Sequence, residues 1–303
     1  MDRMGEHHSA LFAQPARITR RGFLAATLCG IVVAPGSRAA ALDTRDYSTE
    51  EFAWGGIRRT LLSKGSGPTV FVFHEINGLT TNCLTLGDDL VARGFRVVIP
   101  RFFGSVPGPL GYFKACEGRT IFACYGRTDY GSVSSWIKAL ARMKGGQNGF
   151  GAIGNCLTGA LPLLMLQSRR CVAPVLCQPA LPLTYVPWIP GSDSALGLAP
   201  VDLEAARRMS QVADIPILGI RYASDSKCPA ARFATLRSTF ESRFLCLELE
   251  GEGHSTLIAH RCDRAFDTVV AFLRSRLVDG EWPTLPADCR AAACSSHGPG
   301  DGR

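Results

Sequence analysis

Residues 149–159 read GFGAIGNCLTG and place Cys156 between an apolar run and a segment of helical period. The run at 149–154 is short and nearly all apolar, which is typical of a strand covered on both faces of a sheet. Gly154 and Gly159 leave room for a sharp turn from strand to helix that would expose the central side chain. The stretch therefore predicts a parallel sheet with a cysteine nucleophile at the end of one strand.

The start of the following helix would stabilise a Cys156 thiolate through its dipole. A buried structural cysteine followed by a glycine-containing turn remains the alternative. Two residues depart from the usual strand-turn-helix pattern. Thr158 stands where a glycine is usual, and Pro162 removes a backbone donor from the helix predicted over 157–167.

Five further apolar runs alternate with segments of helical period, which predicts parallel strands joined by crossover helices. The fold class is therefore α/β, a mostly parallel sheet with helices on both faces. The runs are 69–74, 96–100, 173–177, 216–222 and 244–249, and further helices are expected at 84–93, 128–143 and 261–277.

Residues 1–41 have the layout of a cleavable export signal. Arg20 and Arg21 precede the apolar run 25–33, and small residues stand at 39–41. The run is too short for a permanent membrane span, and it resembles a bacterial twin-arginine signal. An ordinary N-terminal helix and an uncleaved anchor are the alternatives. We expect export by the twin-arginine machinery and a mature chain starting near Leu42, in the periplasm or outside the cell.

Composition excludes several classes of protein. The chain has 303 residues, of which 46% are hydrophobic and 19% charged, as expected for a globular domain. Beyond residue 41 there are 28 Lys and Arg against 24 Asp and Glu, an excess too small to indicate nucleic-acid binding. Eleven of the 12 cysteines follow residue 41. They form no zinc-binding spacing, but export would allow disulfides among them.

Two stretches interrupt the alternation of strands and helices in the domain expected over 42–282. Residues 181–208 begin with a proline-rich segment without a clear period, which contains Tyr185 and Trp188. We expect a partial lid there. Residues 283–303 are rich in Ala, Gly, Pro and Ser, and we expect a disordered tail.

A catalytic cysteine needs a base and a group that orients the base. His254 follows the run 244–249 in a glycine-containing loop, and Asp225 follows the run 216–222. Because the carboxyl ends of parallel strands share one edge of a sheet, Cys156, Asp225 and His254 are expected to meet there. A solvated loop histidine and a turn-forming aspartate are the alternatives. Weaker candidates for the acid are Asp214, Asp193 and Glu252.

The segments HEINGL (74–79), RVVIPRFFG (96–104), GNCLTG (154–159) and GEGH (251–254), with Asp225, resemble the dienelactone hydrolase family of α/β-hydrolases. The resemblance covers roughly residues 69–277. It implies a Cys, His, Asp triad, with Cys156 as nucleophile, His254 as base and Asp225 as its partner. Glu75 would be the partner of the thiol, with a surface carboxylate as the alternative. The resemblance also implies lactone and ester hydrolysis without a cofactor. The chain departs from the family in two respects. Arg101 stands where the family often has an aspartate. The type members of the family are cytoplasmic, whereas this chain is expected to be exported.

In an α/β-hydrolase the backbone N–H groups of Ile76 and Leu157 would stabilise the oxyanion of the reaction. The resemblance also implies an arginine four residues after the catalytic histidine, which binds the carboxylate of the lactone. Ile258 stands there, although Arg119 or Arg127 could supply a charge.

The sequence thus predicts a hydrolase of small esters or lactones that favours neutral substrates, with Tyr185 and Trp188 lining the pocket. A non-catalytic binding protein on the same scaffold is the alternative. The absence of a C-x-x-C motif disfavours a thiol redox protein.

Overall fold

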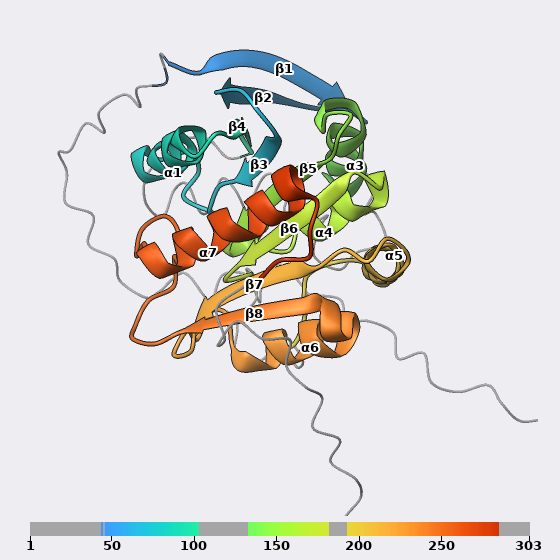
Figure 1. Ribbon diagram of the computed structural model, residues 1–303, viewed down its shortest axis with the longest axis vertical. Helices are drawn as coiled ribbons and strands as arrows, with labels where there is room; N and C mark the ends of the chain where they lie inside the picture. The colour runs from blue at the N-terminus through green and yellow to red at the C-terminus, as the bar shows by residue number, and fades with distance from the viewer. Residues whose placement is uncertain (1–43, 45, 103–132, 182–192, 285–303) are drawn as a thin grey trace, which may run out of the picture. The chain divides into compact units, whose positions relative to one another are not determined.

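The computed structural model describes residues 44, 46–102, 133–181 and 193–284. Their strands form one sheet in the order β1-β2-β4-β3-β5-β6-β7-β8 (Figure 1). The strands β3 to β8 pair in parallel, whereas β1 pairs with β2, and β2 with β4, in antiparallel fashion. This mostly parallel sheet confirms the predicted fold class. The strands are β1 (Ser48–Trp54), β2 (Ile57–Lys64), β3 (Thr69–Phe73), β4 (Arg96–Pro100), β5 (Phe150–Asn155), β6 (Cys171–Cys177), β7 (Ile217–Tyr222) and β8 (Phe244–Leu249).

The six predicted strands are present, with ends that differ by at most two residues. All residues of β3, β5 and β7 are buried, as expected for strands covered on both faces. The hairpin of β1 and β2 was not predicted. Only Phe52 of β1 is buried, so this edge strand lacks the continuous apolar run that marked the others. Gly55 and Gly56 form the hairpin turn, both with positive φ.

Helices cover both faces of the sheet (Figure 1). The helices α1 (Thr81–Ala92) and α7 (Asp263–Arg274) pack on one face, where Leu86, Val72 and Val269 share a buried cluster. The other face carries α3 (Val133–Lys144), α4 (Pro162–Met165), α5 (Pro200–Val212) and α6 (Ala230–Phe240). The parallel strands are therefore enclosed, and polar groups at their carboxyl ends converge on one edge.

Two helical predictions require correction. The helix expected over 157–167 is broken into a 3-10 turn, Cys156–Thr158, the short helix α4 and a second 3-10 turn, Leu166–Ser168. Pro162 is the first residue of α4, where a missing N–H costs nothing. Residues 200–208, assigned to the lid, belong to α5, whose Ala206 is fully buried in the core. The rest of α5 and all of α6 were not predicted.

Several other predictions lie wholly or mostly outside the described residues. These are the export signal at 1–41, the side chains Arg119, Arg127, Tyr185 and Trp188, and residues 285–303 of the tail. Within the described ranges, no helix is both long enough and apolar enough to span a bilayer. The seven cysteines of these ranges are all free thiols, so the disulfides that export would allow do not occur among them.

Candidate active site

Cys156 occupies a strained turn at the carboxyl end of β5. Its φ is 55°, a left-handed conformation that non-glycine residues rarely adopt. A Cβ atom on Gly154 would lie 2.4 Å from the Thr158 carbonyl oxygen, and one on Gly159 would lie 2.5 Å from the Cα of Pro179. Both glycines are therefore required by close backbone approach. The turn has the geometry predicted for a nucleophile, although the Cys156 side chain is largely buried rather than exposed.

The helix dipole expected to stabilise a Cys156 thiolate is much reduced. Cys156 is the first residue of a three-residue 3-10 turn, and α4 begins only at Pro162 and has four residues. Because the dipole grows from aligned peptides, two short segments provide little of it. Stabilisation of a thiolate must come from a side chain instead.

His254 is placed to provide that stabilisation. Its Nδ1 lies 2.7 Å from Oδ2 of Asp225, which is buried. Its Nε2 is buried and makes no hydrogen bond within the described part of the chain. Burial lowers the pKa of His254, but the hydrogen bond that His254 donates to Asp225 and the interaction with the Cys156 sulfur outweigh this effect, and the pKa rises to about 9. The structure thus brings Cys156, His254 and Asp225 together at one sheet edge.

The weaker candidates for the acid make no hydrogen bond to His254 within the described residues. Asp214 pairs with Arg243 at 3.1 Å. Asp193 and Glu252 are exposed. Among these acidic residues, Asp225 is therefore the one that is bonded to the imidazole.

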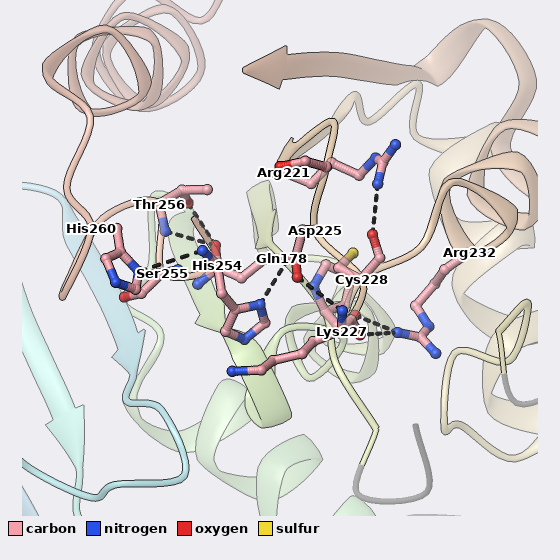
Figure 2. A network of polar contacts seen from close by, with 12 residues as sticks. Gln178, Arg221, Asp225, Lys227, Cys228, Arg232, His254, Ser255, Thr256 and His260 are labelled. Carbon is pink, nitrogen blue, oxygen red and sulfur yellow. Dashed lines mark hydrogen bonds and ion pairs between the residues drawn. The ribbon is translucent and has the colours of Figure 1, made fainter. Parts of the chain in front are cut away.

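Two buried arginines hold the loop that carries Asp225 (Figure 2). The Arg221 guanidinium donates to the Cys228 carbonyl at 2.7 Å, and that of Arg232 donates to the Lys227 carbonyl at 2.8 Å. The Lys227 N–H in turn donates to Oδ1 of Asp225 at 2.9 Å. The second carboxylate oxygen is therefore also fixed. Sequence reasoning missed both arginines, although a charged residue within the apolar run of β7 was a signal for Arg221.

The resemblance implied that Glu75 is the partner of the Cys156 thiol, but the hydrogen bond of the Glu75 carboxylate is made to Gln178. Its Oε1 accepts a hydrogen bond from Nε2 of Gln178 at 3.2 Å, and no hydrogen bond joins it to Cys156 among the described residues. Oε1 of Gln178 accepts from the Thr256 hydroxyl at 2.6 Å, two residues beyond His254 (Figure 2). Gln178 therefore links Glu75 to the histidine loop. It was not predicted, because its only sequence signal is its place directly after β6.

The two residues expected to donate to the oxyanion lie beside Cys156. Leu157 and Ala180 form a small buried cluster with Cys156, and Ile76 packs against it. Ile258 is buried instead in the main cluster between the sheet and the helices α1 and α7. Where it stands, Ile258 offers no charge to a substrate.

A metal ion at this site would need several side chains as its ligands. Within the described residues, no group of three or more His, Cys, Asp or Glu side chains is placed to bind one. The polar groups that converge here are instead a thiol, an imidazole and two carboxylates, which are suited to acyl transfer.

Comparison with solved structures indicates the fold. The protein m3DLH is 15% identical with a TM-score of 0.54, over 78% of this chain and 98% of its own. Est1E from Butyrivibrio proteoclasticus with bound ferulic acid is 12% identical with a TM-score of 0.53, over 76% and 99%. A thioesterase domain from the curacin biosynthetic pathway is 13% identical with a TM-score of 0.50, over 74% and 99%. No protein-family profile and no curated protein matches the sequence. The sheet order, the strained turn after β5 and these similarities together show that the chain has the α/β-hydrolase fold.

Proposed function

We propose that this protein is a cofactor-independent hydrolase of small esters or lactones, similar to dienelactone hydrolases, with Cys156 as its nucleophile. The observation that carries the proposal is the arrangement of three residues: Asp225 is bonded to His254, and His254 interacts with Cys156 in its strained turn. Because Nδ1 of His254 is bonded to Asp225, Nε2 is the nitrogen that exchanges a proton with the thiol.

The reaction proceeds in two halves. Nε2 of His254 accepts the thiol proton, and the sulfur attacks the ester carbonyl carbon. The resulting oxyanion accepts hydrogen bonds from the N–H groups of Ile76 and Leu157. When the carbonyl re-forms, the alkoxide leaves with the proton from His254. A water molecule then gives its proton to His254 and attacks the thioester, which releases the acid and restores the thiol.

Glu75 has a supporting role in this proposal. Its carboxylate is buried at the end of β3 and bound to Gln178, which also holds the loop of His254. Loss of Glu75 would therefore disturb both the loop that carries Ile76 and the loop that carries His254.

Selective alkylation tests the proposed nucleophile. Burial, together with the nearby Glu75 carboxylate, raises the pKa of Cys83 to about 12, and burial raises that of Cys246 to about 11, so these thiols stay protonated near neutral pH. Iodoacetamide at pH 7.5 should modify Cys156 first and abolish hydrolysis of p-nitrophenyl acetate. Cys156→Ala should lose both the fast alkylation and the hydrolysis, whereas Cys262→Ala, which removes a partly exposed thiol elsewhere, should keep both. An active Cys156→Ala variant would eliminate the mechanism. An inert wild type would favour the binding-protein alternative.

We also propose that residues 1–41 direct export by the twin-arginine machinery and that the enzyme works in the periplasm or outside the cell. The proposal is supported by Arg20 and Arg21, the apolar run after them and the alanines at 39–41. That pathway carries folded proteins, which agrees with the free thiols of the described residues, six of which are buried.

A further inference from the structure

Two peptide groups flank the place of the oxyanion, and each has its carbonyl held by two hydrogen bonds. The Cys156 carbonyl accepts from the N–H groups of Gly159 at 2.8 Å and Ala180 at 2.9 Å. The Glu75 carbonyl accepts from the Gly78 N–H at 3.0 Å and from Nδ1 of His74 at 2.8 Å. Because a trans peptide directs its N–H opposite to its C=O, these bonds set the directions of the following N–H groups. Three of the four donors are backbone groups, and the fourth is an imidazole.

The proton position on His74 follows from its second contact. Nε2 of His74 accepts a hydrogen bond from the Phe102 N–H at 3.0 Å. A neutral imidazole has one acceptor and one donor nitrogen, so Nδ1 carries the proton and donates to the Glu75 carbonyl. The ring is fully buried, and burial lowers the pKa of His74 to about 4. His74 is therefore neutral near pH 7, and its donor is the Nδ1–H group.

The end of β3 is also attached to the nucleophile turn. The Thr158 hydroxyl lies 3.0 Å from the His74 carbonyl oxygen and 3.2 Å from that of Phe73, and it accepts from the Asn155 N–H at 3.1 Å. The Asn155 amide donates to the Phe73 carbonyl at 2.9 Å. Thr158 thus uses its side chain where a glycine is usual in this turn. The two peptides that flank the oxyanion belong to one connected unit.

We propose that His74 is a positioning residue of this hydrolase, which orients the Glu75–Ile76 peptide so that the Ile76 N–H points at the oxyanion. This inference rests on the proposed function. In this role His74 acts through the peptide and not as a catalytic group. Its loss should therefore impair the step that develops an oxyanion and leave the reactivity of the Cys156 thiol unchanged.

Two substitutions test the hydrogen bonds of the two His74 nitrogens one at a time. The amide of His74→Asn lies near the position of Nδ1 and can donate to the Glu75 carbonyl. The longer side chain of His74→Gln places its amide near Nε2 and can accept from Phe102, but it leaves the Glu75 carbonyl without its side-chain donor. We expect kcat for p-nitrophenyl acetate to fall at least about tenfold in His74→Gln, with KM nearly unchanged, and to stay within about threefold in His74→Asn.

Alkylation by iodoacetamide provides the control reaction. The thiolate displaces iodide from a saturated carbon, so no oxyanion forms. Its rate at Cys156 should stay within about twofold of wild type in both variants. A trifluoromethyl ketone, which forms a tetrahedral adduct, should lose affinity in His74→Gln in parallel with kcat. Unchanged kcat in His74→Gln, equal losses in the two variants, or alkylation that falls with hydrolysis would each overturn the inference.

A second pair of variants covers the case in which the His74 variants do not fold. Thr158→Val removes only the hydroxyl, and Thr158→Ser keeps it. The same split between hydrolysis and alkylation is expected for Thr158→Val but not for Thr158→Ser, and equal behaviour of the two would overturn the inference. A wild type that neither hydrolyses esters nor alkylates rapidly would instead refute the proposed function, and the inference with it.

Discussion

Oδ2 of Asp225 lies 2.7 Å from Nδ1 of His254, and this contact decides which imidazole nitrogen is available for chemistry. Two loops after neighbouring strands, β7 and β8, meet in it. The carboxylate is held on its other oxygen by the Lys227 N–H, so it cannot rotate away without breaking a second bond. In the proposed mechanism the pair is therefore a preorganised base beside the Cys156 turn.

The raised pKa of His254 predicts a dependence of stability on pH. Since the folded-state pKa is about 9 and the ordinary value about 6.5, protonation stabilises the folded state. This contribution is fully present below about pH 6.5 and is lost as the pH rises through about 9. The free energy of unfolding should therefore fall over that range, and less so in Asp225→Asn, where His254 has lost its partner. Urea unfolding at several pH values measures both. Asp279→Asn, which removes an exposed carboxylate, serves as the control and should retain the wild-type slope.

Substitutions within the triad should have graded effects on activity. Cys156→Ser should leave only weak hydrolysis, because the site is arranged for a thiol, which gives up its proton more readily than a hydroxyl. His254→Ala should cost on the order of a thousandfold or more in kcat, and Asp225→Ala less, because a residue that orients the base contributes less than the base itself. Steady-state kinetics with p-nitrophenyl acetate compares the three. A larger loss in Asp225→Ala than in His254→Ala would contradict the assigned roles.

Gly154 should not tolerate a side chain. The Cβ of Gly154→Ala would meet the carbonyl oxygens of Thr158 at 2.4 Å and Gly159 at 2.9 Å, which are backbone atoms and cannot rotate away. We expect a loss of about 1–3 kcal/mol in the free energy of unfolding, together with loss of activity. Gly94→Ala is the control that measures the cost of a positive φ without steric crowding. Gly94 has a φ of 89°, and a Cβ atom added there would meet open space. It should cost about 1 kcal/mol and spare activity.

Substrate charge should affect the specificity of the enzyme. An isoleucine at position 258 cannot offset the desolvation of a carboxylate, whereas a charge-assisted hydrogen bond to arginine is worth about 1.5–3 kcal/mol. We therefore expect kcat/KM for a carboxylated lactone to lie below that of its methyl ester. A clear preference of the wild type for the free acid would show that another cation, such as Arg119 or Arg127, binds it.

Export should depend on the arginine pair. Replacing both Arg20 and Arg21 with lysine keeps the charge but removes the pair that the twin-arginine machinery recognises. We expect the precursor to stay inside the cell, whereas the wild-type protein should start near Leu42 after export. Fractionation and N-terminal sequencing measure both. Export of the double variant at the wild-type level would refute the signal.

The sequence by itself determined the parallel sheet and the identity of the reactive groups. Six strands were evident because residues buried on both faces leave continuous apolar runs, as in Thr69–Phe73 and Phe244–Leu249. Cys156, Asp225 and His254 could be selected because parallel strands end at the same edge, and the structure brings these three together.

Only the tertiary structure decided how the reactive groups are held. The reactive groups are held by a few specific hydrogen bonds from the side chains of Gln178, Arg221, Arg232 and Thr158, and such bonds leave no period in a sequence. The hairpin of β1 and β2 was missed for a related reason, since an exposed edge strand needs few apolar residues. Local patterns determine which side chains a strand carries to its end. The side chains that surround them there depend on contacts between segments far apart in the chain.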